Sequence, residues 1–181
     1  MVRVMLAKGH TALASVITLG LFDIVPYFQK FEVNEIGLFY GSVLVGSLFP
    51  DIDESRSYIG RKLGVISVIV SSIFKHRTFT HYLIFPIVIY FSIIGFIEDD
   101  ISKNILQGFV FGMFLHTLGD MFTVGGIKGF FFPIFPNTKI WALPEFMRFY
   151  TGSTHEYILI YFLYFLNCLV LGDLIFNSWS F

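Results

Sequence analysis

Long stretches without a charged residue are the feature that most constrains this chain. About 20 mostly apolar residues suffice for a helix to cross a bilayer. The sequence holds four windows near that length and a shorter fifth that ends at a proline: Thr11–Gln29 (interrupted only by Asp23), Tyr82–Ile97, Asn104–Gly119, Tyr157–Gly172 and Ile36–Phe49. We therefore expect an all-α, multi-pass transmembrane helical bundle of about five spans.

The composition excludes other classes of protein. Of the 181 residues 55% are hydrophobic and 14% are charged, whereas soluble domains carry about 25% charged residues, and a soluble domain this small buries too little surface to hide so much apolar area. The net charge of −1 provides no basic surface for nucleic acid, so none is expected as a partner. The single cysteine, Cys168, excludes an internal disulfide and a cysteine-based zinc cluster. Without repeats or linkers, residues 1–181 are expected to form one membrane-embedded domain.

Two segments need a separate interpretation. The apolar window Leu63–Phe74 has only 12 residues, so we expect a short helix that is interfacial or re-entrant. The first window follows Arg3 and Lys8, as in a signal peptide, but no small-residue cleavage site comes after it. We expect an uncleaved first helix.

The distribution of basic residues predicts the orientation. Five spans would place two basic residues, Lys30 and Lys103, on one side of the membrane and ten on the side of the N-terminus: Arg3, Lys8, Arg56, Arg61, Lys62, Lys75, Arg77, Lys128, Lys139 and Arg148. Basic residues mark the cytoplasmic side. The N-terminus is therefore expected inside and the C-terminus outside.

Histidines and aspartates gather in four motifs at the ends of these windows. The motifs are Gly9-His10-Thr11, Gly46-Ser47-Leu48-Phe49-Pro50-Asp51-Ile52-Asp53, His76-Arg77-Thr78-Phe79-Thr80-His81 and His116-Thr117-Leu118-Gly119-Asp120. The predicted topology puts all four at the cytoplasmic ends of their helices. Ionisable residues near a membrane are costly and need partners, so their convergence indicates a shared site.

The spacings suit a divalent metal. His116 and Asp120 are four residues apart and share one helix face. Asp51 and Asp53 follow Pro50, and in an extended segment both would project to one side. His76 and His81 fit a loop or helix entry better than one helix. Imidazoles with carboxylates suit zinc, manganese or iron.

The candidate metal ligands number seven: His10, Asp51, Asp53, His76, His81, His116 and Asp120. Since one tetrahedral zinc site takes four ligands, two ions are expected to fit. Asp53 or Glu156 is the candidate proton acceptor, and Arg77 the candidate holder of an anionic group. Plainer interpretations stay open: Asp51 or Asp53 as helix caps, Asp120 as the ion-pair partner of Arg77, and Glu156 as a carboxylate favoured at a helix N-terminus.

Taken in order, the four motifs resemble the YdjM-type (DUF457) family of inner-membrane metal-dependent hydrolases. Phe132-Pro133 and the stretch from Thr151-Gly152-Ser153 to Glu156 are also similar to that family, so the resemblance runs from about residue 9 to 160. It implies a multi-pass helical protein of the inner membrane with a divalent-metal site.

The sequence thus predicts a membrane-bound, metal-dependent hydrolase with its site at the cytoplasmic face. An amphiphilic or phosphorylated substrate, such as a lipid-linked phosphoester, suits a site at the membrane surface. The alternative is a metal-ion or small-molecule carrier that uses the same cluster, but the helix centres are nearly all apolar. A scaffold with a structural metal is a third interpretation, against which the surplus of ligands argues.

Overall fold

The computed structural model describes residues 5–74 and 77–178, and this part of the chain is mostly helical. In chain order its elements are α1 (Ala7–Ile24), the 3-10 helix η1 (Phe28–Lys30), α2 (Val33–Gly46), η2 (Phe49–Asp53), α3 (Tyr58–Leu63), α4 (Val65–Ile73), η3 (Phe79–His81), α5 (Ile84–Ile94), α6 (Asp100–Met121), β1 (Ile127–Lys128), β2 (Lys139–Ile140), η4 (Glu145–Met147) and α7 (Thr154–Ser178).

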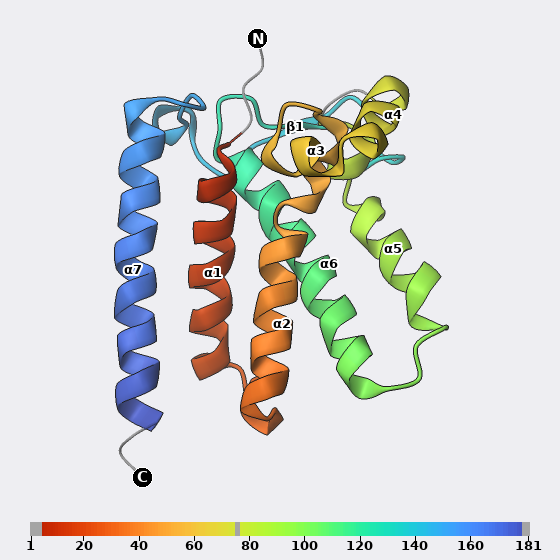
Figure 1. The fold of residues 1–181 in the computed structure, drawn as a ribbon. Coiled ribbons are helices and arrows are strands. Elements are labelled where there is room, and N and C mark those ends of the chain that lie inside the picture. Colours follow the sequence, from red (N-terminus) through yellow and green to blue (C-terminus); the bar gives the residue numbers. More distant parts are fainter. Residues whose placement is uncertain (1–4, 75–76, 179–181) are drawn as a thin grey trace.

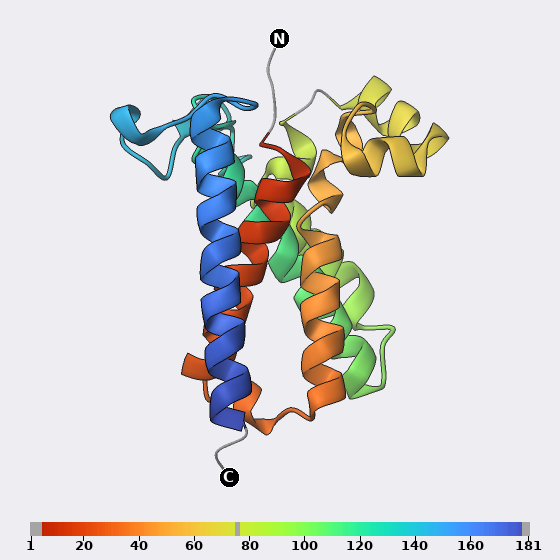
Figure 2. The ribbon, with the colours of Figure 1, turned by 60° about the vertical axis from the view of Figure 1, so that its left-hand side comes forward.

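The long helices stand side by side, and the start of α1 and the end of α7 lie at opposite ends of the bundle (Figures 1 and 2). Helix α7 packs on α1, while α2 and α5 both pack on α6. The apolar core lies where α1, α2 and α6 meet, around Leu19, Phe22, Phe39, Val43 and Leu115. These contacts hold the ends of α1, α2 and α6 in fixed positions.

Helices α2 and α6 approach closely through glycines. A Cβ atom at Gly46 would overlap the carbonyl oxygen of Phe109, and one at Gly112 would overlap that of Val43. Small residues allow two backbones in a membrane protein to come this near. The close approach brings the end of α2, with the residues that follow it, against the last turns of α6.

Among the described residues, two helical segments are long and apolar enough to cross a membrane, Val33–Asp53 (α2 with η2) and Thr154–Leu174 in α7, and α5 is a shorter apolar helix. The structure thus confirms a helical protein, and the five spans stay a prediction. At 1.5 Å per residue, the 11 residues of α5 extend only about 16 Å. Helices α1 and α6 contain charged residues and histidines that lower their mean hydropathy.

The short apolar segment forms α4, which turns sharply from α3 at Gly64 (φ 50°). Figure 1 shows both short helices at the end of the bundle where α1 begins. Several apolar side chains of α4 are exposed, including Val65 and Ile73, but Ser67 is buried and donates a hydrogen bond to the carbonyl of Ile52 at 2.7 Å. Helix α4 therefore anchors η2.

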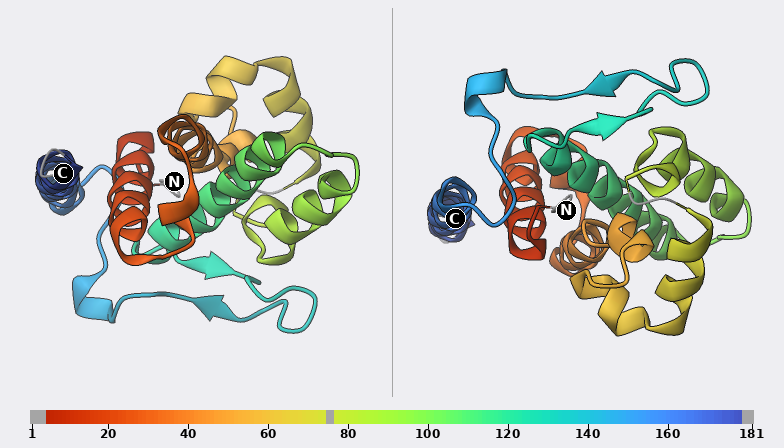
Figure 3. Two further views of the ribbon diagram at one scale, coloured as in Figure 1. Left: turned by 90° about the horizontal axis from the view of Figure 1, so that it is seen from below. Right: turned by 90° about the horizontal axis from the view of Figure 1, so that it is seen from above.

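The segment between α6 and α7 crosses the same end of the bundle. Strands β1 and β2 pair antiparallel, with Ile127 opposite Ile140. They lie on the side opposite α3 and α4, and η4 leads from them to α7 (Figure 3). All segments that carry the sequence motifs thus gather at one end.

Candidate metal centre

The last turns of α6 carry His116 and Asp120, both fully buried. The Nδ1 atom of His116 lies 2.7 Å from the carbonyl oxygen of Ser47 at the end of α2. A carbonyl oxygen can only accept, so Nδ1 is the donor and the lone pair of the neutral ring is on Nε2. Nε2 points toward Asp120, whose Oδ2 lies 3.8 Å away.

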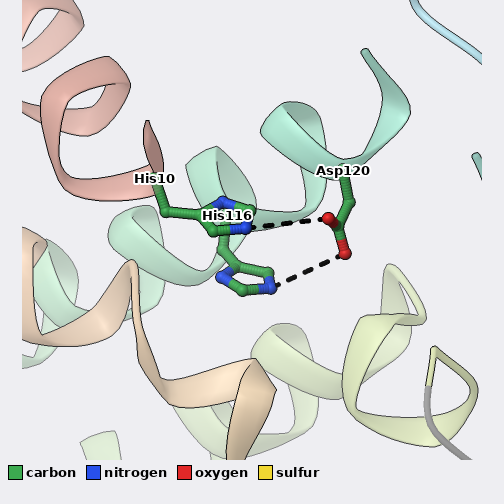
Figure 4. A group of neighbouring side chains, drawn as sticks. All are labelled: His10, His116 and Asp120. Carbon is green, nitrogen blue, oxygen red and sulfur yellow. Dashed lines mark ion pairs between the residues drawn. The ribbon is translucent and has the colours of Figure 1, made fainter. Parts of the chain in front are cut away.

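His10 of α1 completes a group of three with these residues. Its ring stacks on that of His116, with centroids 3.8 Å apart and planes at 11°. Its Nε2 lies 3.6 Å from Oδ1 of Asp120. Figure 4 shows the two imidazoles and the carboxylate facing one another. One nitrogen or oxygen from each residue lies within 4.8 Å of the others, a spacing at which they could hold one metal ion.

A second group joins the first through His116. It consists of Asp51 of η2, His81 of η3 and His116. Oδ1 of Asp51 lies 3.6 Å from His116 Nε2, and His81 Nε2 lies 3.2 Å from the same atom. His81 Nε2 also lies 3.3 Å from Oδ2 of Asp120. The five residues therefore surround one small volume from four different elements.

Several buried atoms of this cluster have no hydrogen-bond partner within the described residues. They are both ring nitrogens of His10, Oδ1 of Asp51 and Oδ2 of Asp120. A buried polar atom without a partner costs about 1–3 kcal/mol. Imidazole nitrogens and carboxylate oxygens without thiolates are ligands for zinc, manganese or iron. The donor set and its unpaired atoms therefore fit a divalent metal ion.

Asp53 contacts His81 on the side of its Nδ1 atom and belongs to neither of the two ligand groups. We expected Asp51 and Asp53 to project to one side of an extended segment, and this is wrong because the segment forms the 3-10 helix η2. At three residues per turn, side chains two positions apart diverge. Asp51 therefore faces His116, while Oδ2 of Asp53 lies 3.5 Å from His81 Nδ1.

Thr80 links Asp53 to His81. Its hydroxyl donates to Asp53 Oδ2 at 2.6 Å and lies 2.9 Å from His81 Nδ1. Burial lowers the pKa of His81, but the carboxylates of Asp120 and Asp53 on its two sides outweigh burial and raise that pKa to about 9. The two carboxylates therefore favour the protonated ring, and a metal ion bound at this imidazole would take the place of that proton.

Arg77 pairs with the cluster. Its Nη2 lies 2.7 Å from Asp120 Oδ1, and its Nη1 donates to Thr123 Oγ1 at 3.2 Å and to the carbonyl of Gly126 at 3.4 Å. The guanidinium is buried, so these contacts match the ion-pair interpretation left open by the sequence. His76, another candidate ligand, lies outside the described residues.

Glu156 at the start of α7 is buried, but its carboxylate accepts hydrogen bonds from two backbone amides. The N–H groups of Leu6 and Gly152 donate to it at 2.7 and 2.5 Å. Glu156 therefore connects the entry of α1 to the entry of α7. It belongs to neither group of candidate ligands.

Sequence reasoning missed two supports of the cluster, the carbonyl of Ser47 and the hydroxyl of Ser57. The carbonyl of Ser47 orients His116, and the hydroxyl of Ser57 donates to the carbonyl of Asp51 at 2.8 Å. A carbonyl has no sequence signature. The small residues that bring α2 and α6 together, Gly46 and Gly112, were the one available signal.

Comparison with known proteins finds one matching family and several related sequences. A family model described as YdjM inner membrane protein matches residues 5–177. The protein called "Uncharacterized protein YvsG" of Bacillus subtilis is 42% identical over 123 residues, which cover 68% of this chain and 71% of that protein. Inner membrane protein YdjM of Escherichia coli is 34% identical over 88 residues, which cover 48% of this chain and 45% of that protein. No solved structure matches.

Proposed function

The chain belongs to the YdjM family of inner membrane proteins, and we propose that it is a membrane-bound, metal-dependent hydrolase. One observation carries the proposal: buried ligand atoms of His10, Asp51 and Asp120 have no hydrogen-bond partners among the described residues, and they belong to two ligand groups that share His116. Such atoms are satisfied together by one cation. The ligands of that cation come from His10, Asp51, His81, His116 and Asp120, the members of the two groups, with zinc the first candidate and manganese or iron the alternatives.

The proposal places the metal site at the cytoplasmic face of a five-span bundle. It is supported by the charge pattern, since ten of the twelve Lys and Arg residues fall in segments on the N-terminal side. Those segments and the cluster gather at one end of the bundle (Figure 1). Basic residues mark the cytoplasmic side.

The number of metal ions that the cluster can hold depends on His116, because both ligand groups include it. Its Nδ1 is used by the Ser47 carbonyl, which leaves Nε2 as the nitrogen shared by both ligand groups. A ring nitrogen has one lone pair, so the two groups cannot each hold an ion through His116. We therefore expect one ion within the five residues; a second would require other ligands.

The residues around the cluster have separable roles in hydrolysis. A divalent metal held here would act as a Lewis acid and bring the pKa of water toward ~7. Asp53 and Thr80 hold the His81 ring, and Arg77 balances the charge of Asp120. Asp53 is the stronger candidate for taking a proton, because its Oδ2 lies 3.5 Å from Nδ1 of the candidate ligand His81, whereas Glu156 belongs to neither ligand group.

For a phosphate ester the reaction balances without a redox partner. The oxygen of a water molecule forms a new bond to phosphorus, and the P–O bond to the alcohol breaks. One proton of the water goes to the leaving alcohol. Asp53 can hold that proton between the two events.

The test is metal analysis and hydrolysis on detergent-purified protein, with and without chelator. His116→Ala and Asp120→Ala should lose the metal and all chelator-sensitive hydrolysis of phosphoester substrates. His155→Ala is the matched control, because His155 is exposed and outside the cluster. Wild-type protein that retains no divalent metal would refute the proposal. Metal flux into proteoliposomes without hydrolysis would favour the carrier.

A further inference from the structure

A cavity of about 380 Å³ lies directly beside the metal cluster. Its walls come from the start of α1, from the segment η2–α3 and from the first turn of α7. The residues that matter here are Lys8, Asp51, Arg56, Tyr58, Arg61 and Tyr157. The cavity therefore lies at the end of the bundle that carries the basic residues.

Asp51 joins this cavity to the cluster. It lines the cavity and is only 4% exposed. Its Oδ1 has no hydrogen-bond partner among the described residues and lies 3.6 Å from His116 Nε2. A molecule in the cavity would therefore lie against a ligand of the proposed metal ion.

The other charged residues of the cavity wall are all cations. Lys8, Arg56 and Arg61 have exposed side chains. Within residues 5–74 and 77–178, no carboxylate forms an ion pair with any of the three. Nη1 of Arg61 donates to the carbonyl of Arg56 at 2.6 Å, which holds this guanidinium beside the turn before α3. Three unpaired cations around a metal-binding carboxylate form a site for an anion.

Arg77 cannot supply this function in the arrangement seen. Its guanidinium is 2.7 Å from Asp120 and also bonds Thr123 and Gly126. Guanidinium and ammonium groups are the usual protein partners of phosphate oxygens. In the part of the chain that the structure describes, the cations of the cavity wall are free to bind a substrate anion beside the cluster.

We propose that this cavity binds the phosphate group of a phosphate ester through Lys8, Arg56 and Arg61, with the ester facing Asp51. The inference rests on the proposed hydrolase function and names its substrate class. Tyr58 and Tyr157 are 49% and 45% exposed at the cavity wall. Tyrosine, with an apolar ring and a polar end, favours the membrane–water interface. The site therefore suits a phosphate ester that approaches at the level of the lipid headgroups.

The experiment measures phosphate binding and zinc content on the same zinc-loaded, detergent-purified samples. Inorganic phosphate is titrated by calorimetry into wild type and into the triple variant Lys8→Gln, Arg56→Gln, Arg61→Gln. The triple variant should bind phosphate about tenfold more weakly or worse, since each exposed ion pair contributes a few-fold, and should keep its zinc. The matched control Lys62→Gln, Lys128→Gln, Lys139→Gln removes three exposed cations that do not line the cavity and should bind as wild type does.

Two further arms identify the source of the phosphate. Glycerol phosphate tests a soluble ester, and phosphatidic acid in nanodiscs of neutral lipid tests a lipid headgroup. Tighter binding of phosphatidic acid that is lost in the cavity variant supports a lipid substrate, and equal binding supports a soluble one. Zinc-loaded wild type and cavity variant with equal phosphate affinity would overturn the cavity proposal and leave the hydrolase standing. Absence of any bound divalent metal, whether zinc, manganese or iron, from wild type would instead overturn the hydrolase.

Discussion

Replacement of Thr80 by valine tests whether the residues behind His81 set the affinity for metal. Valine keeps the shape of threonine but removes the hydroxyl that donates to Asp53 at 2.6 Å and lies 2.9 Å from His81 Nδ1. Thr80 is 3% exposed, so water cannot replace these contacts. His81 would then lose part of what fixes its ring toward the cluster.

The expected loss of metal affinity follows from the contact between Thr80 and His81, because Thr80 would orient a metal ligand without binding the metal itself. Loss of such a support lowers metal affinity about 10–100-fold. At a metal concentration 100 times the wild-type Kd, bound metal stabilises the fold by about 2.7 kcal/mol, and an affinity weaker by that factor leaves about 0.4–1.4 kcal/mol. The metal-dependent gain in stability should therefore fall to about half of its wild-type value or less.

The assay is unfolding in detergent with and without added zinc, together with zinc affinity measured against a competing chelator. Thr11→Val is the control, because the hydroxyl of Thr11 bonds only carbonyls of its own helix, those of Ala7 and Lys8. Equal zinc affinity in Thr80→Val and Thr11→Val would refute the role assigned to Thr80 and Asp53.

Four further predictions concern the bundle and the metal. Gly112→Ala should lower the free energy of unfolding in detergent by about 1–3 kcal/mol, because the added Cβ would overlap the Val43 carbonyl oxygen. Gly41→Ala is the control and should leave that free energy unchanged, because the space around Gly41 is open. Asn167→Leu should lower the same free energy by about 0.6–1.7 kcal/mol, because it removes the hydrogen bond from Asn167 of α7 to the Ala12 carbonyl of α1. An unchanged free energy of unfolding would contradict that role. Chelator should lower the unfolding midpoint of wild type but not of His116→Ala. A reporter fused after the C-terminus should be found outside the cell membrane, and a cytoplasmic signal would exclude five spans.

Local features of the site were predictable from the sequence because they depend on neighbours along the chain. The spacing of His116 and Asp120 places both on one helix face whatever the rest of the fold does. Apolar windows predict helices, and the motifs at their ends predict which side of the bundle the histidines occupy. The family was recognisable from the order of these motifs.

The tertiary structure decided what each of these residues contacts. Asp51 and Asp53 are separated because the backbone after Pro50 forms a 3-10 helix, a choice stabilised by hydrogen bonds from Ser57 and Ser67 farther along the chain. Arg77 forms an ion pair with Asp120, which lies 43 residues farther along the sequence. The three cations beside Asp51 come together only because α1 begins next to the turn before α3. Such pairings depend on packing between distant segments, which no local pattern specifies.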